Sequence, residues 1–184
     1  MDYPELFLKK HEDKRLRQGH LWVFSNESDT KRSPVDAFGA GDVVVVNDSD
    51  GKALGLAYLN PNALICARLL TRKTNIAIGE KFFKTRLAQA LALRQRLFER
   101  PFYRLVFGES DGLPGLVIDR YDAVLSVQIT TAGMEVHKQL LVKVLVDLLQ
   151  PAAILLKNDT SQRQLENLSV EPELALGELP EKLL

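Results

Sequence analysis

The sequence contains one cysteine, Cys66, among its 184 residues. A single cysteine cannot form an internal disulfide, which is typical of proteins in the reducing cytosol. Apolar runs are short or broken by charges, so no segment predicts a transmembrane helix. The N-terminus also lacks the basic and apolar regions of a signal peptide. These absences predict a cytoplasmic protein with no membrane partner.

The sequence also lacks the motifs of common cofactor and metal sites. Gly39 and Gly41 form a minimal Gly-x-Gly, but they precede an apolar strand instead of opening a helix, so we interpret them as a turn. Cys66 lies in an apolar strand, which favours a buried core thiol over a nucleophile. The histidines lack the short spacings of zinc ligands: His11, His20 and His137. We therefore predict no catalytic residue and no metal site.

The formal net charge of zero hides an uneven distribution of charge. Residues 65–104 hold ten Lys/Arg and two acidic residues, whereas residues 105–184 hold six basic and twelve acidic residues. A basic segment of this kind indicates either a surface that faces a polyanion or a solvated helix face. Charge alone leaves both interpretations open.

The first part of the chain has the pattern of a small β domain. Apolar stretches at 5–8, 21–25, 43–47, 53–59 and 64–71 predict strands, and residues 11–19 predict a short helix that ends at Gly19. Short strands with regularly spaced turns are typical of compact barrels. We therefore predict a pseudo-barrel β domain over residues 1–72.

Residues 73–175 predict a second, small α/β domain with helices on a sheet. Helical periodicity covers residues 80–100, 135–150 and 161–168, and strands are predicted at 103–109, 115–121, 123–130 and 152–157. Residues 176–184 have no apolar partner and predict a segment that leads out of this domain. The fold class of the whole chain is therefore α+β.

The stretch GESDGLPGLVIDRY, residues 108–121, combines three carboxylates with three glycines and a proline. Glu109, Asp111 and Asp119 could form an acid/base or metal set, but Asp-Gly and Pro-Gly are strong turn formers between strands. We favour a strand connection over a catalytic site. A loop with so many small residues can still approach a ligand.

Cations and aromatic residues in the first domain have the composition of an RNA-binding groove, in which cations meet phosphates and aromatic planes meet bases. Trp22 follows the basic helix directly, and three cations stand at the end of the last strand. The predicted RNA contacts are Lys14, Arg15, Arg17, His20, Arg68, Arg72 and Lys73, with Arg94, Arg96 and Arg100 as a second patch.

Two separated stretches resemble a known enzyme family. The run KKHEDKRLRQGHLWVFSNE, residues 9–27, resembles the start of the PUA domain, named for pseudouridine synthases and archaeosine transglycosylases. The run FYRLVFGESDGLPGLVIDRY, residues 102–121, resembles the central segment of RlmI-type 23S rRNA cytosine-C5 methyltransferases. The runs VQITTAG and GELPEKLL also fit this family, so the resemblance covers essentially the whole chain.

The resemblance implies an RNA-binding domain, a central α/β domain and a Rossmann-like domain that binds S-adenosylmethionine and carries a catalytic cysteine. We expect this third domain to lie outside residues 1–184. The chain would then position 23S rRNA, bind no S-adenosylmethionine itself and need the methyltransferase domain as a partner. In the whole enzyme, the family implies attack of a thiolate on C6 of cytosine, methyl transfer to C5 and loss of the C5 proton. We also expect an interdomain role for the loop formed by Glu109, Asp111, Gly112, Pro114 and Gly115.

Two other interpretations remain open at this point. The chain could act alone as an RNA-binding adaptor in ribosome assembly. Alternatively, its acidic C-terminal half could bind a protein partner or form a homodimer. Binding through phosphate contacts weakens steeply with salt, whereas an apolar dimer interface responds little, so salt dependence separates these alternatives.

Overall fold

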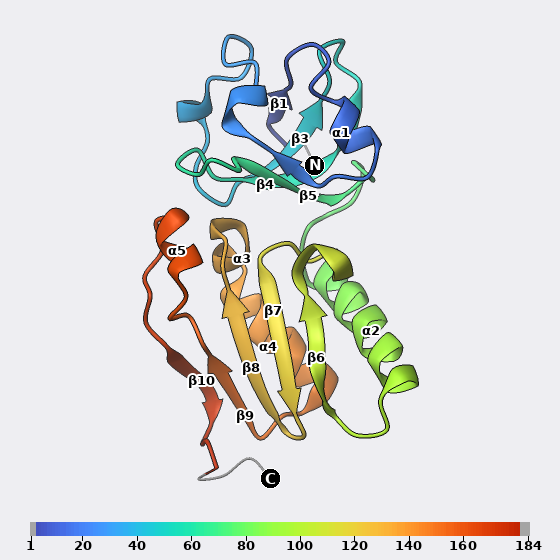
Figure 1. The fold of residues 1–184 in the computed structure, drawn as a ribbon, viewed down its shortest axis with the longest axis vertical. Helices are drawn as coiled ribbons and strands as arrows, with labels where there is room; N and C mark the ends of the chain where they lie inside the picture. Colours follow the sequence, from blue (N-terminus) through green and yellow to red (C-terminus); the bar gives the residue numbers. More distant parts are fainter. Residues whose placement is uncertain (1–2, 181–184) are drawn as a thin grey trace. The chain divides into compact units, whose positions relative to one another are not determined.

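The computed structural model describes residues 3–180 and has the mixed α+β architecture predicted from the sequence (Figure 1). The chain divides into two compact units, with the division between Ala77 and Ile78. Each unit contains one five-stranded sheet. Within the described residues, no helix is both long enough and apolar enough to span a membrane.

The sheet of the first unit has the strand order β1-β3-β4-β5-β2, with β1 parallel to β3 and the other pairs antiparallel. Its strands are β1 (Glu5–Phe7), β2 (Trp22–Val23), β3 (Val43–Asn47), β4 (Ala53–Leu59) and β5 (Ala67–Thr71). The helical elements are α1 (Lys14–Arg17) and two 3-10 turns, η1 (Ser25–Glu27) and η2 (Val35–Ala37).

Local sequence explains the β3–β4 hairpin. Gly51 has a φ of 85°, a conformation that favours glycine, and the carboxylate of Asp48 accepts hydrogen bonds from the backbone amides of Asp50 (3.0 Å) and Lys52 (2.8 Å). The inward side chains of these strands form one core together with the Cys66 thiol, which is 1% exposed. The predicted burial of this cysteine is therefore confirmed.

The second unit places two long helices against an antiparallel sheet with one parallel pair. The strand order is β10-β9-β8-β7-β6, and only β8 and β9 run parallel. In Figure 1, α4 lies behind the strands, and α2 packs against α4 and β6. The elements in chain order are α2 (Glu80–Leu97), β6 (Phe102–Phe107), the 3-10 turn η3 (Gly108–Asp111), β7 (Leu116–Tyr121), β8 (Val124–Ile129), α3 (Ala132–Val136), α4 (Lys138–Leu149), β9 (Ala153–Leu156), α5 (Ser161–Leu165) and β10 (Glu173–Gly177).

The helix predicted over residues 135–150 is in fact two helices that meet at His137. His137 has φ −96° and ψ 8°, and its ring packs on the buried ring of Phe83, with the ring centroids 5.0 Å apart. This contact comes from α2, which is distant in sequence. Apolar periodicity along residues 135–150 therefore could not reveal the break.

The strand β10 is a second departure from the sequence prediction, which treated residues 176–184 as a segment leading out of the domain. Leu176 and Gly177 instead pair with β9, because β9 would otherwise leave its outer backbone groups without hydrogen-bond partners. A Cβ atom at Gly177 would lie 1.9 Å from the carbonyl oxygen of Ala152, so only glycine fits there. Residues 181–184 of the predicted segment lie outside the described residues.

Candidate nucleic-acid interface

In the first unit the predicted RNA contacts lie on or next to α1 and β5. We call them the α1–β5 surface: Lys14, Arg15, Arg17, His20, Arg68, Arg72 and Lys73. One arginine joins the two elements. The Arg72 Nη2 group donates hydrogen bonds to the backbone carbonyl oxygens of Leu16 and His20, the latter at 3.3 Å. Residues more than fifty positions apart in the sequence thus share one surface.

Two arginines of α1 are paired with carboxylates. Arg15 Nη2 lies 2.5 Å from Oε1 of the buried Glu27, and its guanidinium lies 5.0 Å from the ring centroid of Phe24. Arg17 pairs with Asp13 and, at 2.5 Å, with Asp48. The hydrogen bond from Arg17 lowers the pKa of the Asp13 carboxyl. The α1–β5 surface therefore carries less uncompensated positive charge than its sequence suggests.

The lysines of the same surface differ from the arginines. Lys14 and Lys73 are both exposed, and neither forms an ion pair with any residue between positions 3 and 180. Their ammonium groups are available to phosphate oxygens without first breaking an internal contact. Among the predicted contacts, these two lysines are the best suited to bind a polyanion.

Trp22 supplies an aromatic plane beside these cations. On β2 the neighbouring Val23 is fully buried, whereas Trp22 is 41% exposed and is the antiparallel partner of Arg68 on β5. The alternation along this strand thus buries Val23 and directs Trp22 outward. An exposed indole and a guanidinium on adjacent strands provide both features needed to bind an unstacked base and its phosphate.

In the second unit, Arg94 on α2 holds the loop after β6 through hydrogen bonds to Asp111. Its Nη1 and Nη2 atoms lie 2.5 and 2.7 Å from the two carboxylate oxygens of Asp111, and its Nε donates to the carbonyl oxygen of Arg104 at 3.0 Å. The Arg94 side chain is 13% exposed and that of Asp111 is 8% exposed. RNA contact by Arg94 stays a prediction, and this geometry does not favour it. Arg96 and Arg100 are exposed, as a contact with RNA requires.

The loop of residues 108–115 is an ordered strand connection. Asp111 also accepts a hydrogen bond from the backbone amide of Phe107 at 2.7 Å, and Gly112 has a φ of 68°. Leu113 and Pro114 are buried. Its carboxylates do not converge on one site, since Asp119 pairs with Arg104 on β6 instead, at 2.8 Å. An interdomain role for this loop, including Glu109 and Gly115, stays a prediction.

Sequence reasoning missed two cations on α2. Lys81 and Lys84 are exposed, and neither forms an ion pair with a residue in the described range 3–180. They lie with Arg96 on the exposed side of α2, where at 100° per residue the three positions fall within about 120° around the helix axis. The charge excess of residues 65–104 was the signal that could have identified them.

The carboxyl end of β8 is the part of the second unit that most resembles a nucleotide-binding turn, because a parallel strand here leads into a helix. Protein groups already occupy it. Glu166 Oε2 accepts the backbone amide of Ala132 at 3.2 Å, and a Cβ on Gly115 would lie 2.2 Å from Thr131 Oγ1. The residues at this turn therefore do not fit S-adenosylmethionine. Within residues 3–180, no three His, Cys, Asp or Glu side chains are arranged to hold a metal ion.

Comparison with known proteins agrees with the resemblance seen in the sequence. A family model described as a PUA-like domain matches residues 6–72. The chain is 38% identical over 178 residues to ribosomal RNA large subunit methyltransferase I of Aliivibrio fischeri, covering 95% of this chain and 44% of the relative. It is 35% identical over 185 residues to the protein of the same name from Klebsiella pneumoniae, covering 99% of this chain and 46% of the relative.

Solved structures give the same fold. A putative SAM-dependent methyltransferase from Streptococcus mutans superposes with a TM-score of 0.76 at 17% identity, covering 97% of this chain and 44% of that chain. A putative methyltransferase complexed with SAH also superposes with a TM-score of 0.76, at 15% identity. The chain thus spans less than half the length of the proteins that it matches. Residues 6–72 form a PUA-like domain, and over nearly its whole length the chain is homologous to part of the ribosomal RNA large subunit methyltransferase I proteins.

Proposed function

We propose that this chain is the RNA-binding and substrate-positioning part of an S-adenosylmethionine-dependent methyltransferase that modifies C5 of a cytosine in large-subunit rRNA. The observation that carries the proposal is the 35–38% identity to ribosomal RNA large subunit methyltransferases over 95–99% of the chain. This similarity extends across both units. In this proposal the target is 23S rRNA, and the rest of such an enzyme is the partner of this chain.

The α1–β5 surface is proposed to bind the RNA backbone. Lys14 and Lys73 contact phosphates directly, since no internal ion pair competes for them among the described residues. Arg15 and Arg17 keep about two fifths of their side chains exposed, so they add contacts while still holding their carboxylate partners. Trp22 on β2 is the strand partner of Arg68, is 41% exposed and offers a face for stacking.

The chain's own residues do not perform methyl transfer in this proposal. S-adenosylmethionine would supply the methyl group from the portion of the relatives that this chain does not span. Cys66 is unsuited to be the nucleophile, because burial raises the pKa of its thiol to about 11 and the reactive thiolate is then scarce at neutral pH. The role of residues 3–180 is to bind and orient the RNA.

The test is a titration of fluorescently labelled 23S rRNA fragments with this chain at several salt concentrations. The double variant Lys14→Ala/Lys73→Ala is compared with Lys31→Ala/Lys52→Ala, which removes the same charge from exposed positions outside the α1–β5 surface. Each lost phosphate contact should make the slope of log affinity against log salt shallower by about 0.7 on single-stranded RNA. We expect a shallower slope for Lys14→Ala/Lys73→Ala and an unchanged slope for Lys31→Ala/Lys52→Ala.

Three results would contradict the proposal or part of it. If the chain fails to bind rRNA even at low salt, RNA binding does not reside in these residues. If both double variants weaken binding equally, the attraction is general and the α1–β5 surface is not the contact. If binding is confirmed but a relative's remaining portion never methylates RNA together with this chain, the adaptor interpretation replaces that of a methyltransferase component.

A further inference from the structure

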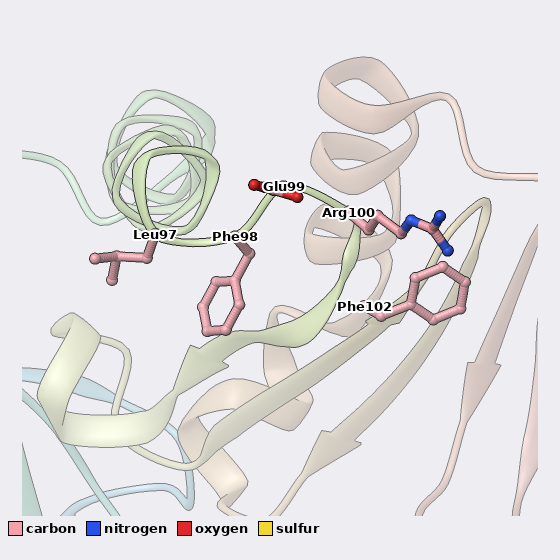
Figure 2. A pocket seen from close by; sticks show the side chains of 5 residues that line it. All are labelled: Leu97, Phe98, Glu99, Arg100 and Phe102. Carbon is pink, nitrogen blue, oxygen red and sulfur yellow. The ribbon is translucent and has the colours of Figure 1, made fainter.

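The connection between α2 and β6 forms an open groove with aromatic walls. Its lining residues, which we call the aromatic groove, are Leu97, Phe98, Glu99, Arg100 and Phe102, and the space between them is about 570 Å³ (Figure 2). Leu97 is 66% exposed, Phe98 48% and Phe102 43%. Three large apolar side chains thus meet solvent within six consecutive residues.

These side chains do not belong to the buried face of α2. The buried face of α2 consists of Phe82, Phe83, Leu87 and Ala90, all in its first eleven residues. Toward its C-terminal end the apolar residues instead face solvent, since Leu93 is 47% exposed and precedes Leu97 by one turn. Isolated exposed apolar residues are ordinary, but a contiguous group beside a groove indicates a binding surface.

The groove is held in place by ordered contacts on both sides. The Phe98 ring packs on the buried ring of Tyr103, with centroids 5.4 Å apart and a tilt of 33°. The backbone amide of Phe98 donates to the carbonyl oxygen of Arg94 at 2.9 Å, and the amide of Phe102 donates to that of Arg100 at 2.9 Å. Rings fixed in this way lose little conformational freedom when a flat partner stacks on them.

One cation lies at the aromatic groove, and three more lie along α2. Arg100 lines it, and Figure 2 shows its guanidinium extending toward the same side as the Phe102 ring. Arg96, Lys84 and Lys81 lie on the exposed side of α2, turned about 100–160° around the helix axis from Leu97. Within residues 3–180, neither Arg100 nor any of these three cations forms an ion pair. From Lys81 to Arg96 this side of the helix extends about 22 Å at 1.5 Å per residue. Glu99 is the one acidic residue between positions 81 and 108.

We propose that the aromatic groove binds a single-stranded segment of RNA, with bases stacked on Phe98 and Phe102 and a phosphate on Arg100. The proposal rests on the proposed function, and it adds a second contact surface in the other unit. Aromatic planes beside a guanidinium combine the stacking and phosphate contacts that single-stranded nucleic acid uses. Stacking tolerates any base, so this contact holds the strand without reading its sequence.

The test measures binding of a labelled single-stranded oligouridine to the chain. Phe98→Ala and Phe102→Ala should each weaken binding about 5- to 150-fold, which corresponds to the roughly 1–3 kcal/mol of one stacked base. The salt slope should stay unchanged, because no phosphate contact is lost. Arg100→Ala should instead make the slope shallower by about 0.7. The control is Leu165→Ala, which removes a 76% exposed apolar side chain from α5 in the same unit.

A conservative variant guards against loss of folding. Phe102→Leu keeps an apolar side chain but removes the aromatic face, so it should melt like the parent chain and still bind oligouridine more weakly. If Phe102→Leu binds as tightly as the parent chain, the groove does not stack bases. If the phenylalanine variants change the oligomeric mass and leave RNA affinity unaltered, a second copy occupies the groove and the proposal is wrong.

The two proposals fail in different ways. Suppose that the parent chain binds RNA and that Lys14→Ala/Lys73→Ala weakens this binding, whereas the phenylalanine variants do not. The proposed function then stands, and the aromatic groove does not bind RNA. If the parent chain binds neither oligouridine nor rRNA at low salt, both proposals are wrong.

Discussion

The Arg94–Asp111 pair offers the sharpest test of how the second unit is held together. Asp111 accepts three hydrogen bonds, two from the Arg94 guanidinium and one from the backbone amide of Phe107. Both side chains are nearly buried, at 13% and 8% exposure. Asp111→Ala would therefore leave a guanidinium and a backbone amide without their partner.

Removing one partner of a buried ion pair costs about 3–5 kcal/mol, because the other charge stays buried without compensation. Even at the lower value, the melting temperature of a unit of this size should fall by roughly 10–15 °C. Arg94→Lys keeps the charge but loses the two-pronged contact and should cost less, about 1–3 kcal/mol. Urea unfolding followed by circular dichroism measures these differences.

The matched control is Arg96→Ala, which removes the same charge from an exposed position on the same helix and should change stability by less than about 0.5 kcal/mol. The double variant Arg94→Ala/Asp111→Ala should be more stable than the sum of the single losses predicts, because neither charge is then left alone. If Arg94→Ala destabilises the chain no more than Arg96→Ala does, the pair is not a structural clamp. The interpretation of Arg94 as an RNA contact would then regain support.

Three further predictions concern single residues. Gly115→Ala should destabilise the second unit by more than about 2 kcal/mol, because its Cβ would lie 2.2 Å from Thr131 Oγ1. Gly108→Ala should cost only about 1–2 kcal/mol, because Gly108 also has a positive φ but its Cβ would meet open space. Equal losses of stability in urea unfolding would contradict this. Cys66, whose burial raises its thiol pKa to about 11, should resist iodoacetamide in the folded chain and react once urea unfolds it; rapid labelling of the native chain would show that the thiol is accessible. Burial lowers the pKa of His137 below its ordinary value of 6.5. Near this pH the unfolded state therefore binds more protons at His137 than the folded state does, and the stability of the fold should decrease as pH falls through about 6.5. The fall in urea midpoint from about pH 7.5 to about pH 5.5 should be smaller in His137→Asn, and an identical pH dependence would refute this assignment.

Most of the regular structure follows from short-range pattern. The strands β3 and β4 and their hairpin were predictable because alternating apolar residues surround an Asp-Ser-Asp-Gly turn, whose backbone requirements are local. The helix α2 was predictable for a similar reason, although it ends at Leu97 instead of continuing to residue 100. Its end depends on Phe98, which adopts an extended conformation and packs on Tyr103 from the next strand.

The candidate site shows where this kind of prediction stops. The sequence indicated the cations of the first unit and the aromatic Trp22 beside them, because these residues are close together along the chain. It could not indicate which cations are neutralised, since the partners of Arg17 and Arg94 come from other elements, at Asp48 and Asp111. The aromatic groove was missed for the same reason: whether Phe102 is buried or exposed depends on what packs over the sheet edge.

The sequence by itself determined the fold class, the succession of most strands and helices, the turn nature of residues 108–115 and the burial of Cys66, because each depends on local pattern and on the removal of apolar side chains from water. Only the tertiary structure decided that β10 completes the second sheet, that Arg94 clamps Asp111, and that Lys14, Lys73 and the rings of the aromatic groove stay exposed. These outcomes depend on which groups meet across long stretches of chain. The sequence shows that a charged or aromatic residue is present, but not whether its side chain is paired, buried or exposed.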